Sequence, residues 1–444
     1  MSINNEDKNE PIINNTNSDS DCDNDDENKC FKAVKIVSGI IIILLGLAIG
    51  IIFPIIILLI IAEKTENAII AYIIQFIIMM IIISVFTFIG ICTCGAKKLT
   101  SCIIGIIISL IIWALIFVFL CLIFYLPVDN DSVFYKNINE TYWEFNTSKI
   151  SYIKYEGSNT TTEYPIIFVH GGPGEPVNGT QHFLEELVLE GYEVYQYDQF
   201  GCGNSNRATN PKEYTVERHI SDLEEIRKKI GAEKIILISH SWGGSLVSSY
   251  MAKYNDKVFK SIFISPKPIC EDDNSSEIFT KEGNEDINNA LKDNKRFYIS
   301  GILTNLGSET GLYYLMSEDK LDKLFMNYHD NLNMKPGSGE NYNTKGAGFG
   351  FWASIMTSKS FSDMDCNYEN LTKSDAECLV IKGQFDYLSL KNTVLYRDKI
   401  NNSTLILIDG MGHCVEEKYE SIISKNIISF LKNGTTINKP YEEK

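Results

Sequence analysis

The stretch Lys234-Ile-Ile-Leu-Ile-Ser-His-Ser-Trp-Gly-Gly244 joins a run of aliphatic residues directly to a serine and two glycines. The aliphatic run predicts a buried strand over Lys234–Ser239, and the residues after it, up to about Lys253, are expected to form a helix. Ser241 then stands on a sharp strand-to-helix turn, at a helix N-terminus that favours developing negative charge. The general pattern for such a turn is Gly-x-Ser-x-Gly, and Ser239 occupies the position of its first glycine.

Strands and helices are predicted to alternate on both sides of this turn. The other expected strands are Tyr164–Val169, Glu193–Tyr197, Val258–Ile264, Cys378–Lys382 and Thr404–Ile408. Helices are expected at Gln181–Leu189, Thr215–Ile230 and Glu416–Leu431. The alternation predicts an α/β fold with a mostly parallel sheet covered on both faces.

A serine nucleophile needs a base, and the base needs an orienting carboxylate. Asp386 follows the strand Cys378–Lys382, and His413 follows the strand Thr404–Ile408. Both therefore fall in loops at the carboxyl ends of strands, where open α/β sheets place their sites. We expect Ser241, Asp386 and His413 to form a catalytic triad, which requires neither a metal nor another cofactor.

Tetrahedral oxyanions also need preorganised donors. The run His170-Gly171-Gly172-Pro173-Gly174 follows the first of the predicted parallel strands, and its glycines allow backbone N–H groups to turn inward. The backbone N–H groups of Gly172 and Trp242 are the predicted oxyanion hole. Gly171 and Glu175, beside this turn, are candidates for contacting the substrate.

Three motifs together resemble the prolyl aminopeptidases (proline iminopeptidases) of the α/β-hydrolase fold. They are the His170–Gly174 run, Asp198-Gln-Phe-Gly-Cys-Gly-Asn-Ser205 and Ser241-Trp-Gly-Gly244. The resemblance is good over about residues 150–265 and looser over 376–431. It implies a hydrolase domain over residues 129–444 that releases an N-terminal residue, often proline, from peptides.

Carried over by position, the resemblance implies Ser241 as nucleophile, His413 as base, Asp386 as orienting acid, and Gly172 with Trp242 as oxyanion donors. The loop Asp198–Ser205 would support the site, but the arginine that the family has in this loop is Phe200 here.

The resemblance also implies an inserted helical cap, which residues 266–375 should contain. Family members recognise the free amine of the substrate with cap carboxylates, and no position here aligns with them. The unranked candidates are Glu309, Glu318, Asp319 and Glu340.

The N-terminal part of the chain is strongly apolar. Residues 36–62 carry no charge, and 13 of these 27 residues are isoleucine. Uncharged apolar stretches also cover residues 68–94 and 101–128. A bilayer core needs about 20 apolar residues per helix, so residues 30–128 are predicted to form three transmembrane helices that contact the lipid bilayer.

Lysines before the first span and at Lys97 and Lys98 place the N-terminus and the second loop in the cytosol. Three spans then place the hydrolase domain in a lumen or outside the cell. From residue 127 onward there are ten Asn-x-Ser/Thr sites, where chance predicts roughly four, which favours a glycosylated domain. These sites are Asn130, Asn139, Asn146, Asn159, Asn178, Asn274, Asn370, Asn401, Asn402 and Asn433.

Residues 1–29 hold nine acidic residues and two lysines, and are expected to be a disordered acidic tail. The net charge of the whole chain, −17, argues against nucleic acid as a partner.

Two other functions stay open. A lipid or small-ester hydrolase would use the same triad, and a catalytically retired domain would serve only as a membrane interaction module. Epoxide hydrolases and dehalogenases of this fold need aspartate in place of Ser241.

Overall fold

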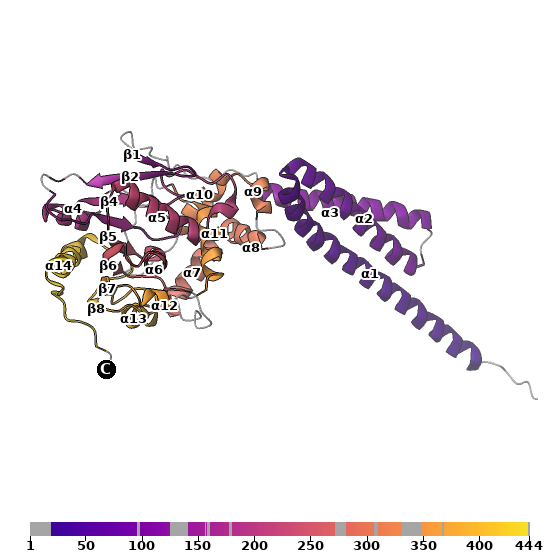
Figure 1. Cartoon of the computed structure of the whole chain (residues 1–444). Coiled ribbons are helices and arrows are strands. Elements are labelled where there is room, and N and C mark those ends of the chain that lie inside the picture. Colours follow the sequence, from indigo (N-terminus) through magenta and orange to yellow (C-terminus); the bar gives the residue numbers. More distant parts are fainter. Residues whose placement is uncertain are drawn as a thin grey trace, which may run out of the picture. The chain divides into compact units, whose positions relative to one another are not determined.

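The computed structural model describes residues 19–95, 98–124, 141–155, 157, 160–176, 180–270, 281–305, 310–330, 348–365 and 368–442 (Figure 1). The chain divides into two compact units, Met1–Tyr125 and Leu126–Lys444.

The first unit consists of long helices: α1 (Asp19–Thr65), α2 (Ala68–Thr93) and α3 (Lys98–Phe124). In the described residues, three helices are long and apolar enough to cross a membrane. Helix α1 begins at Asp19 and so includes residues 19–29 of the acidic segment, while residues 1–18 lie outside the described part.

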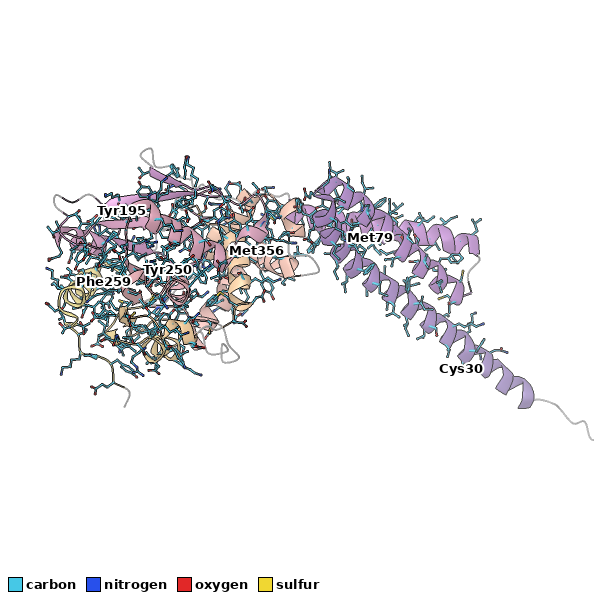
Figure 2. All side chains as sticks on the ribbon, in the orientation of Figure 1. Cys30, Met79, Tyr195, Tyr250, Phe259 and Met356 are labelled. Carbon is cyan, nitrogen blue, oxygen red and sulfur yellow. The ribbon has the colours of Figure 1, made fainter. Side chains whose placement is uncertain are left out.

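Small and polar residues lie where these helices meet: a Cβ at Gly90 of α2 would be 2.6 Å from the Gly39 carbonyl oxygen of α1, and the hydroxyls of Ser84 and Ser109 lie 3.0 Å apart between α2 and α3. The side chain of Asn67 accepts hydrogen bonds from the N–H groups of Ile69 and Ile70 and so caps α2. Met79 of α2 is completely buried (Figure 2). Most isoleucines on the outside of the helices remain exposed, as expected for surfaces that face lipid rather than a protein core.

The second unit is built on a sheet of eight strands in the order β1-β2-β4-β3-β5-β6-β7-β8. The strands are β1 (Thr141–Glu144), β2 (Lys149–Tyr155), β3 (Ile166–Val169), β4 (Val194–Tyr197), β5 (Ile235–His240), β6 (Val258–Ile264), β7 (Glu377–Gly383) and β8 (Ser403–Ile408). Strands β4, β3, β5, β6, β7 and β8 are parallel to one another, so the prediction of a mostly parallel sheet is confirmed.

The antiparallel hairpin of β1 and β2 at one edge of the sheet was not predicted. Strand β2 pairs antiparallel with β4, and the ring of Trp143 on β1 stacks on Tyr152 of β2 at 3.7 Å. The hairpin gains its apolar contacts from aromatic stacking and from a strand about 40 residues later in the sequence. Both strands are short and mix polar with aromatic residues, so the sequence shows no strong apolar pattern from which the hairpin could be predicted.

Helices cover both faces of the sheet. Ile236 and Ile238 of β5 share a core with α4 (His182–Leu189) and α14 (Glu417–Asn433). Because side chains alternate along a strand, Leu237 points to the opposite face. That face is covered by α5 (Val216–Ile230), α6 (Trp242–Lys253) and α13 (Leu390–Lys399), and Tyr250 of α6 is fully buried there (Figure 2).

A helical insertion separates β6 from β7, as expected for a cap. It contains α7 (Lys281–Asp293), α8 (Lys295–Asn305), α9 (Gly311–Leu315), α10 (Glu318–Asp330), α11 (Phe351–Ser362) and α12 (Tyr368–Leu371). Arg207, which precedes the short 3₁₀ helix η1 (Pro211–Glu213), joins this insertion to the rest of the domain. Its guanidinium donates to the carbonyls of Gly348 at 3.1 Å and Phe349 at 3.2 Å, and lies 3.5 Å from the carboxylate of Asp322 on α10.

The cysteines of the second unit are of two kinds. Cys202, Cys378 and Cys414 are free thiols, whereas Cys270 is disulfide-bonded. Cys366, the other cysteine of this unit, lies outside the described residues.

Candidate active site

Ser241 sits on a strained turn between β5 and α6. Its backbone has φ 52° and ψ −120°, a conformation that a residue with a side chain adopts only when its surroundings enforce it. The Ser241 N–H donates to the carbonyl of Ile264 at 3.1 Å, which anchors the turn on β6. Behind the turn, a Cβ at Gly243 would lie 2.2 Å from the Val169 carbonyl oxygen, so only glycine fits there.

Serine in place of glycine at position 239 is accommodated by a hydrogen bond. Ser239 is completely buried, and its hydroxyl donates to the carbonyl of Ile262 at 3.1 Å. The substitution therefore leaves no unpaired polar group under the turn.

The structure brings the three predicted triad residues into hydrogen-bonding distance. His413 Nε2 lies 2.9 Å from Ser241 Oγ, and His413 Nδ1 lies 2.8 Å from Asp386 Oδ1. Because Nδ1 faces a carboxylate, it carries the proton, and Nε2 is free to accept the proton of the serine hydroxyl. All three residues are buried.

Asp386 lies in the loop after β7 and is held on both carboxylate oxygens. Oδ1 also accepts the N–H of Leu388 at 2.9 Å, and Oδ2 forms an ion pair with Lys382 Nζ at 2.5 Å. Burial alone would raise the pKa of Asp386, but the charges of His413 and Lys382 lower this pKa to about 2. Asp386 is therefore an anion at neutral pH. Lys382 could not be identified from the sequence, because a single lysine at the end of a predicted strand carries no signal.

The glycine-rich turn after β3 lies directly against Ser241. A Cβ at Gly171 would be 3.1 Å from Ser241 Cβ, and Gly172 has φ +113°, which favours glycine. His240, next to Ser241, places its Nε2 2.9 Å from the carbonyl oxygen of His413 and so braces the histidine loop. Burial lowers the pKa of His240 to about 4, so this ring is neutral at pH 7.

Gln199 connects the glycine-rich turn to Trp242. Its backbone N–H donates to His170 Nε2 at 2.9 Å, and its side-chain amide donates to the His170 carbonyl at 2.8 Å. Its amide oxygen accepts Trp242 Nε1–H at 3.0 Å. The loop Asp198–Ser205 thus contacts the two segments that carry the predicted oxyanion donors.

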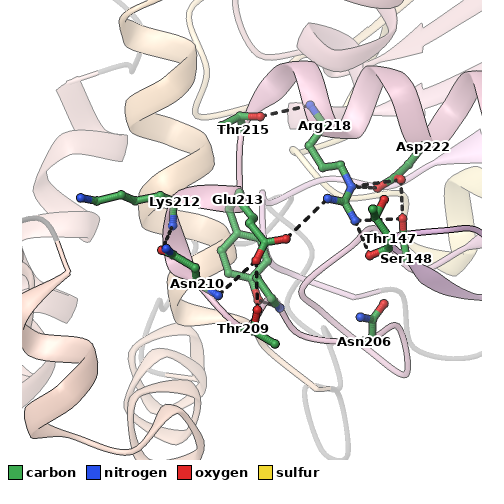
Figure 3. A network of polar contacts seen from close by, with 12 residues as sticks. Thr147, Ser148, Asn206, Thr209, Asn210, Lys212, Glu213, Thr215, Arg218 and Asp222 are labelled. Carbon is green, nitrogen blue, oxygen red and sulfur yellow. Dashed lines mark hydrogen bonds and ion pairs between the residues drawn. The ribbon is translucent and has the colours of Figure 1, made fainter. Parts of the chain in front are cut away.

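An arginine does brace this loop, although it comes from another element. Figure 3 shows the guanidinium of Arg218, on α5, among polar groups that include Asp222 and Glu213. It donates to the Thr147 carbonyl at 2.7 Å, and it lies 4.2 Å above the centre of the Phe200 ring. Phe200 stands where the family resemblance implies an arginine, and the packing of α5 places the cation of Arg218 over the Phe200 ring.

Glu175 follows the glycine-rich turn and pairs with the cap. Its carboxylate lies 2.8 Å from Nε2 of His329 on α10, and the Glu175 side chain is 23% exposed. Burial raises the pKa of Glu175, but the charges of His329, His413 and Lys267 outweigh burial and hold the pKa below its usual value. Glu175 was a candidate from the sequence, but His329 could not be identified, because the sequence of α10 does not show which of its polar residues faces Glu175.

Two of the four cap candidates for recognising the substrate's amine are described by the structure, and both interact with neighbouring side chains. Glu318 interacts with Arg207 and Tyr214, and burial raises the pKa of Glu318. Asp319 forms an ion pair with Lys323 at 3.1 Å. The other two candidates, Glu309 and Glu340, lie outside the described residues. Within the part of the chain that the structure describes, no cluster of three or more His, Cys, Asp or Glu side chains could hold a metal ion.

Comparison with known proteins identifies the fold family. Residues 164–417 match the family described as alpha/beta hydrolase fold. The chain is 36% identical over 128 residues to a proline iminopeptidase of Clostridioides difficile (strain 630), which covers 29% of this chain and 43% of that protein. It is 37% identical over 124 residues to a proline iminopeptidase of Saccharolobus solfataricus, covering 27% of this chain and 37% of that protein.

The chain therefore matches less than half of the length of these relatives. Among solved structures, a bromoperoxidase from Bacillus anthracis is 20% identical with a TM-score of 0.47, and covers 66% of this chain and 100% of its own. The family match extends over more than half of the chain and includes Ser241, Asp386 and His413. This protein belongs to the α/β-hydrolase fold family and is similar to the prolyl aminopeptidases within it.

Proposed function

We propose that this protein is a membrane-anchored serine hydrolase that releases N-terminal residues, with a preference for proline, from peptides. The observation that carries the proposal is the continuous chain from Ser241 Oγ to His413 and Asp386, with steps of 2.9 and 2.8 Å. His413 takes the proton of Ser241 as the hydroxyl attacks the scissile carbonyl, and returns it to the leaving amine. Water then hydrolyses the acyl-enzyme with His413 again as base.

The negative charge of the tetrahedral intermediate needs donors on the side of the glycine-rich turn. The backbone N–H groups of Gly172 and Trp242 fill this role in the proposal. Two observations support it: Gly171 packs against Ser241, and Gln199 bonds both segments. Trp242 is also the first residue of α6, where backbone N–H groups lack helical acceptors.

Glu175 is the group best suited to recognise the substrate's free amine. It is an anion beside the glycine-rich turn, and its present partner is an imidazole from the cap rather than a fixed arginine or lysine. An ammonium group of the substrate would form a charge-assisted hydrogen bond with this carboxylate. In this proposal Glu175 recognises the free amine of the substrate, the role for which four cap carboxylates were candidates from the sequence.

The activity test compares three substrates on the full chain in detergent micelles: a proline amide with a free amine, the same amide after N-acetylation, and a short-chain ester. Faster cleavage of the free-amine substrate supports the aminopeptidase. Cleavage of the ester together with indifference to acetylation supports the lipid or small-ester hydrolase, a reading that the three apolar helices favour because they would hold the domain beside a bilayer.

The Ser241→Ala variant tests the nucleophile itself. We expect it to lose turnover of all three substrates by at least about 10⁴-fold and to lose covalent labelling by a fluorophosphonate probe, because no other group can form the acyl-enzyme. A Ser249→Ala variant, on a later turn of α6, is the matched control and should label normally. Unchanged activity of Ser241→Ala would contradict the proposal, and a wild-type chain that does not label would support a retired site.

The proposed topology places the N-terminus in the cytosol and the hydrolase domain in a lumen or outside the cell. The disulfide at Cys270 supports an oxidising compartment, and Asn146 and Asn433, both in acceptor motifs, are exposed. Treatment with an N-glycosidase should increase the electrophoretic mobility of the chain. Unchanged mobility would count against this orientation.

A further inference from the structure

Two lysines extend into the interior from neighbouring strands, Lys260 on β6 and Lys382 on β7. They are 7% and 3% exposed. Burying an ammonium group costs several kcal/mol unless it is paired, so the partner of each lysine indicates its role. Lys260 pairs with Glu377 at 2.6 Å, a carboxylate that is half exposed at the far end of β7.

Lys382 has partners of a different kind, since both belong to the loop that carries the triad acid. Its Nζ lies 2.5 Å from Asp386 Oδ2 and donates to the Leu388 carbonyl at 2.8 Å. The side chains of Lys382 and Asp386 are 4% and 0% exposed, so water does not compete for this contact. On the opposite side of the carboxylate, Oδ1 receives His413 Nδ1 and the Leu388 N–H.

This arrangement holds the carboxylate of Asp386 from both sides. Rotation of the carboxylate about its Cβ–Cγ bond would break the Lys382 ion pair as well as the His413 hydrogen bond. The rigid strand β7 carries Lys382, whereas Asp386 lies beyond its end. The lysine thus connects the orientation of the acid to the framework of the sheet rather than to its own loop alone.

We propose that Lys382 is a positioning residue of the triad, whose ammonium group holds Oδ2 of Asp386 so that Oδ1 stays directed at His413 Nδ1. The inference rests on the proposed serine-hydrolase function. The contacts of the Lys382 ammonium are Asp386 and the Leu388 carbonyl, so its effect on Ser241 and His413 passes through Asp386.

The charge of Lys382 also has a predictable consequence. A positive charge beside the Asp386–His413 pair opposes uptake of a further proton by that pair. The protonated pair has no free base for Ser241, so Lys382 extends activity to lower pH. The other titratable groups around the pair lie on several elements: His240 after β5, Glu175 after β3, Tyr387 in the acid loop and Cys414 beside His413.

The test compares the full chain with its Lys382→Met and Lys382→Gln variants in detergent micelles. The readouts are the second-order rate constant of fluorophosphonate labelling between pH 5 and 9, and kcat and KM for whichever of the three substrates is cleaved. We expect Lys382→Met to lower the labelling rate and kcat about tenfold with KM unchanged, since orientation of the base is impaired and binding is not. The acid limb of both profiles should move up by about one pH unit.

Lys382→Gln separates orientation from charge. Its amide can still donate to Asp386, so part of the lost rate should return while the acid limb stays displaced. Lys260→Met is the matched control, because it removes a buried lysine from the adjacent strand without touching the triad. We expect its labelling rate and pH profile to match the wild type, even if its thermal midpoint falls.

Three outcomes would overturn the inference alone while the wild type labels normally. Lys382→Met could retain the wild-type rate and acid limb. Alternatively, Lys382→Met could lose no more of the labelling rate than Lys260→Met does, with its acid limb at the wild-type position. Both Lys382 variants could fail to fold while Lys260→Met folds, which would make Lys382 a stability residue. A wild-type chain that does not label at any pH would instead overturn the proposed function, and the inference with it.

Discussion

The carboxyl edge of the sheet and the cap both contribute charged groups near Ser241, but they hold them differently. At the sheet edge, Ser241, Asp386 and His413 each follow a strand whose backbone is hydrogen-bonded to its neighbouring strands. The cap instead places His329 on a helix, 2.8 Å from Glu175. In the proposed enzyme, the chemistry depends on the rigid sheet, and the selectivity depends on how the cap is docked.

Arg207 and Asp322 make some of the polar contacts that dock the cap and hold its helices together. Arg207 reaches the carbonyls of Gly348 and Phe349, while Asp322 accepts the Phe351 N–H at 2.7 Å and lies beside that arginine. Changes at the sheet edge should therefore alter the rate for every substrate. Changes in or against the cap should alter which substrate is preferred, or how stable the cap is.

The largest effect is expected for Asp386→Asn at the sheet edge. An amide cannot stabilise the imidazolium of His413, and it can reverse the ring's tautomer, so kcat should fall about 10⁴-fold for free-amine and ester substrates alike. Steady-state kinetics measure this. Asp398→Asn, on the surface of α13, is the control and should be unaffected. A loss that differs strongly between substrate classes would break the proposed division between chemistry and selectivity.

A smaller and more selective effect is expected for Glu175→Gln. Removing the charge removes the partner of the substrate's ammonium, so the preference for the free-amine substrate over its N-acetylated form should fall about 100-fold, with a much smaller loss on the ester. The ratio of kcat/KM values measures the change, and Asp319→Asn on the exposed side of α10 is the control. Equal losses on all substrates would mean that Glu175 is structural.

The smallest effect concerns the pH dependence of stability. Burial raises the pKa of Asp322 to about 7, against an unfolded value of about 4. The fold therefore prefers the protonated carboxyl group, and this stabilisation is present below about pH 4 and is lost as the pH rises through about 7. The thermal midpoint of the full chain should fall between pH 5 and 8.

Asp322→Asn is permanently neutral, so its thermal midpoint should fall about 2–4 °C less over this interval. Scanning fluorimetry in detergent measures it, with Asp319→Asn as the control. If both variants and the wild type show the same pH dependence, the docking of the cap does not depend on the protonation of Asp322.

Several features could be predicted because they depend on local sequence. The aliphatic run before Ser241 has the length of a buried strand, and the glycines after it allow a helix to pack under the turn. Asp386 and His413 could be found because each follows a similar run. All three predictions use the same physical fact, that parallel strands expose their carboxyl ends at one edge of the sheet.

Other features could not be predicted, because the contacts that define them join distant segments. The hairpin of β1 and β2 depends on pairing with β4. His329 is one polar residue among several on an amphipathic helix, and its partner Glu175 lies about 150 residues earlier in the sequence. Arg218 lies over the Phe200 ring only because α5 packs there.

The sequence by itself determined the α/β fold, the three apolar helices and the positions of the three candidate triad residues, since strand length, helical periodicity and turn residues act over a few positions. Only the tertiary structure decided what surrounds those residues: the ammonium of Lys382 on the triad acid, the imidazole of His329 on Glu175, and the arginine that docks the cap. Burial and ion pairing depend on distances between segments, and a linear pattern contains no distances.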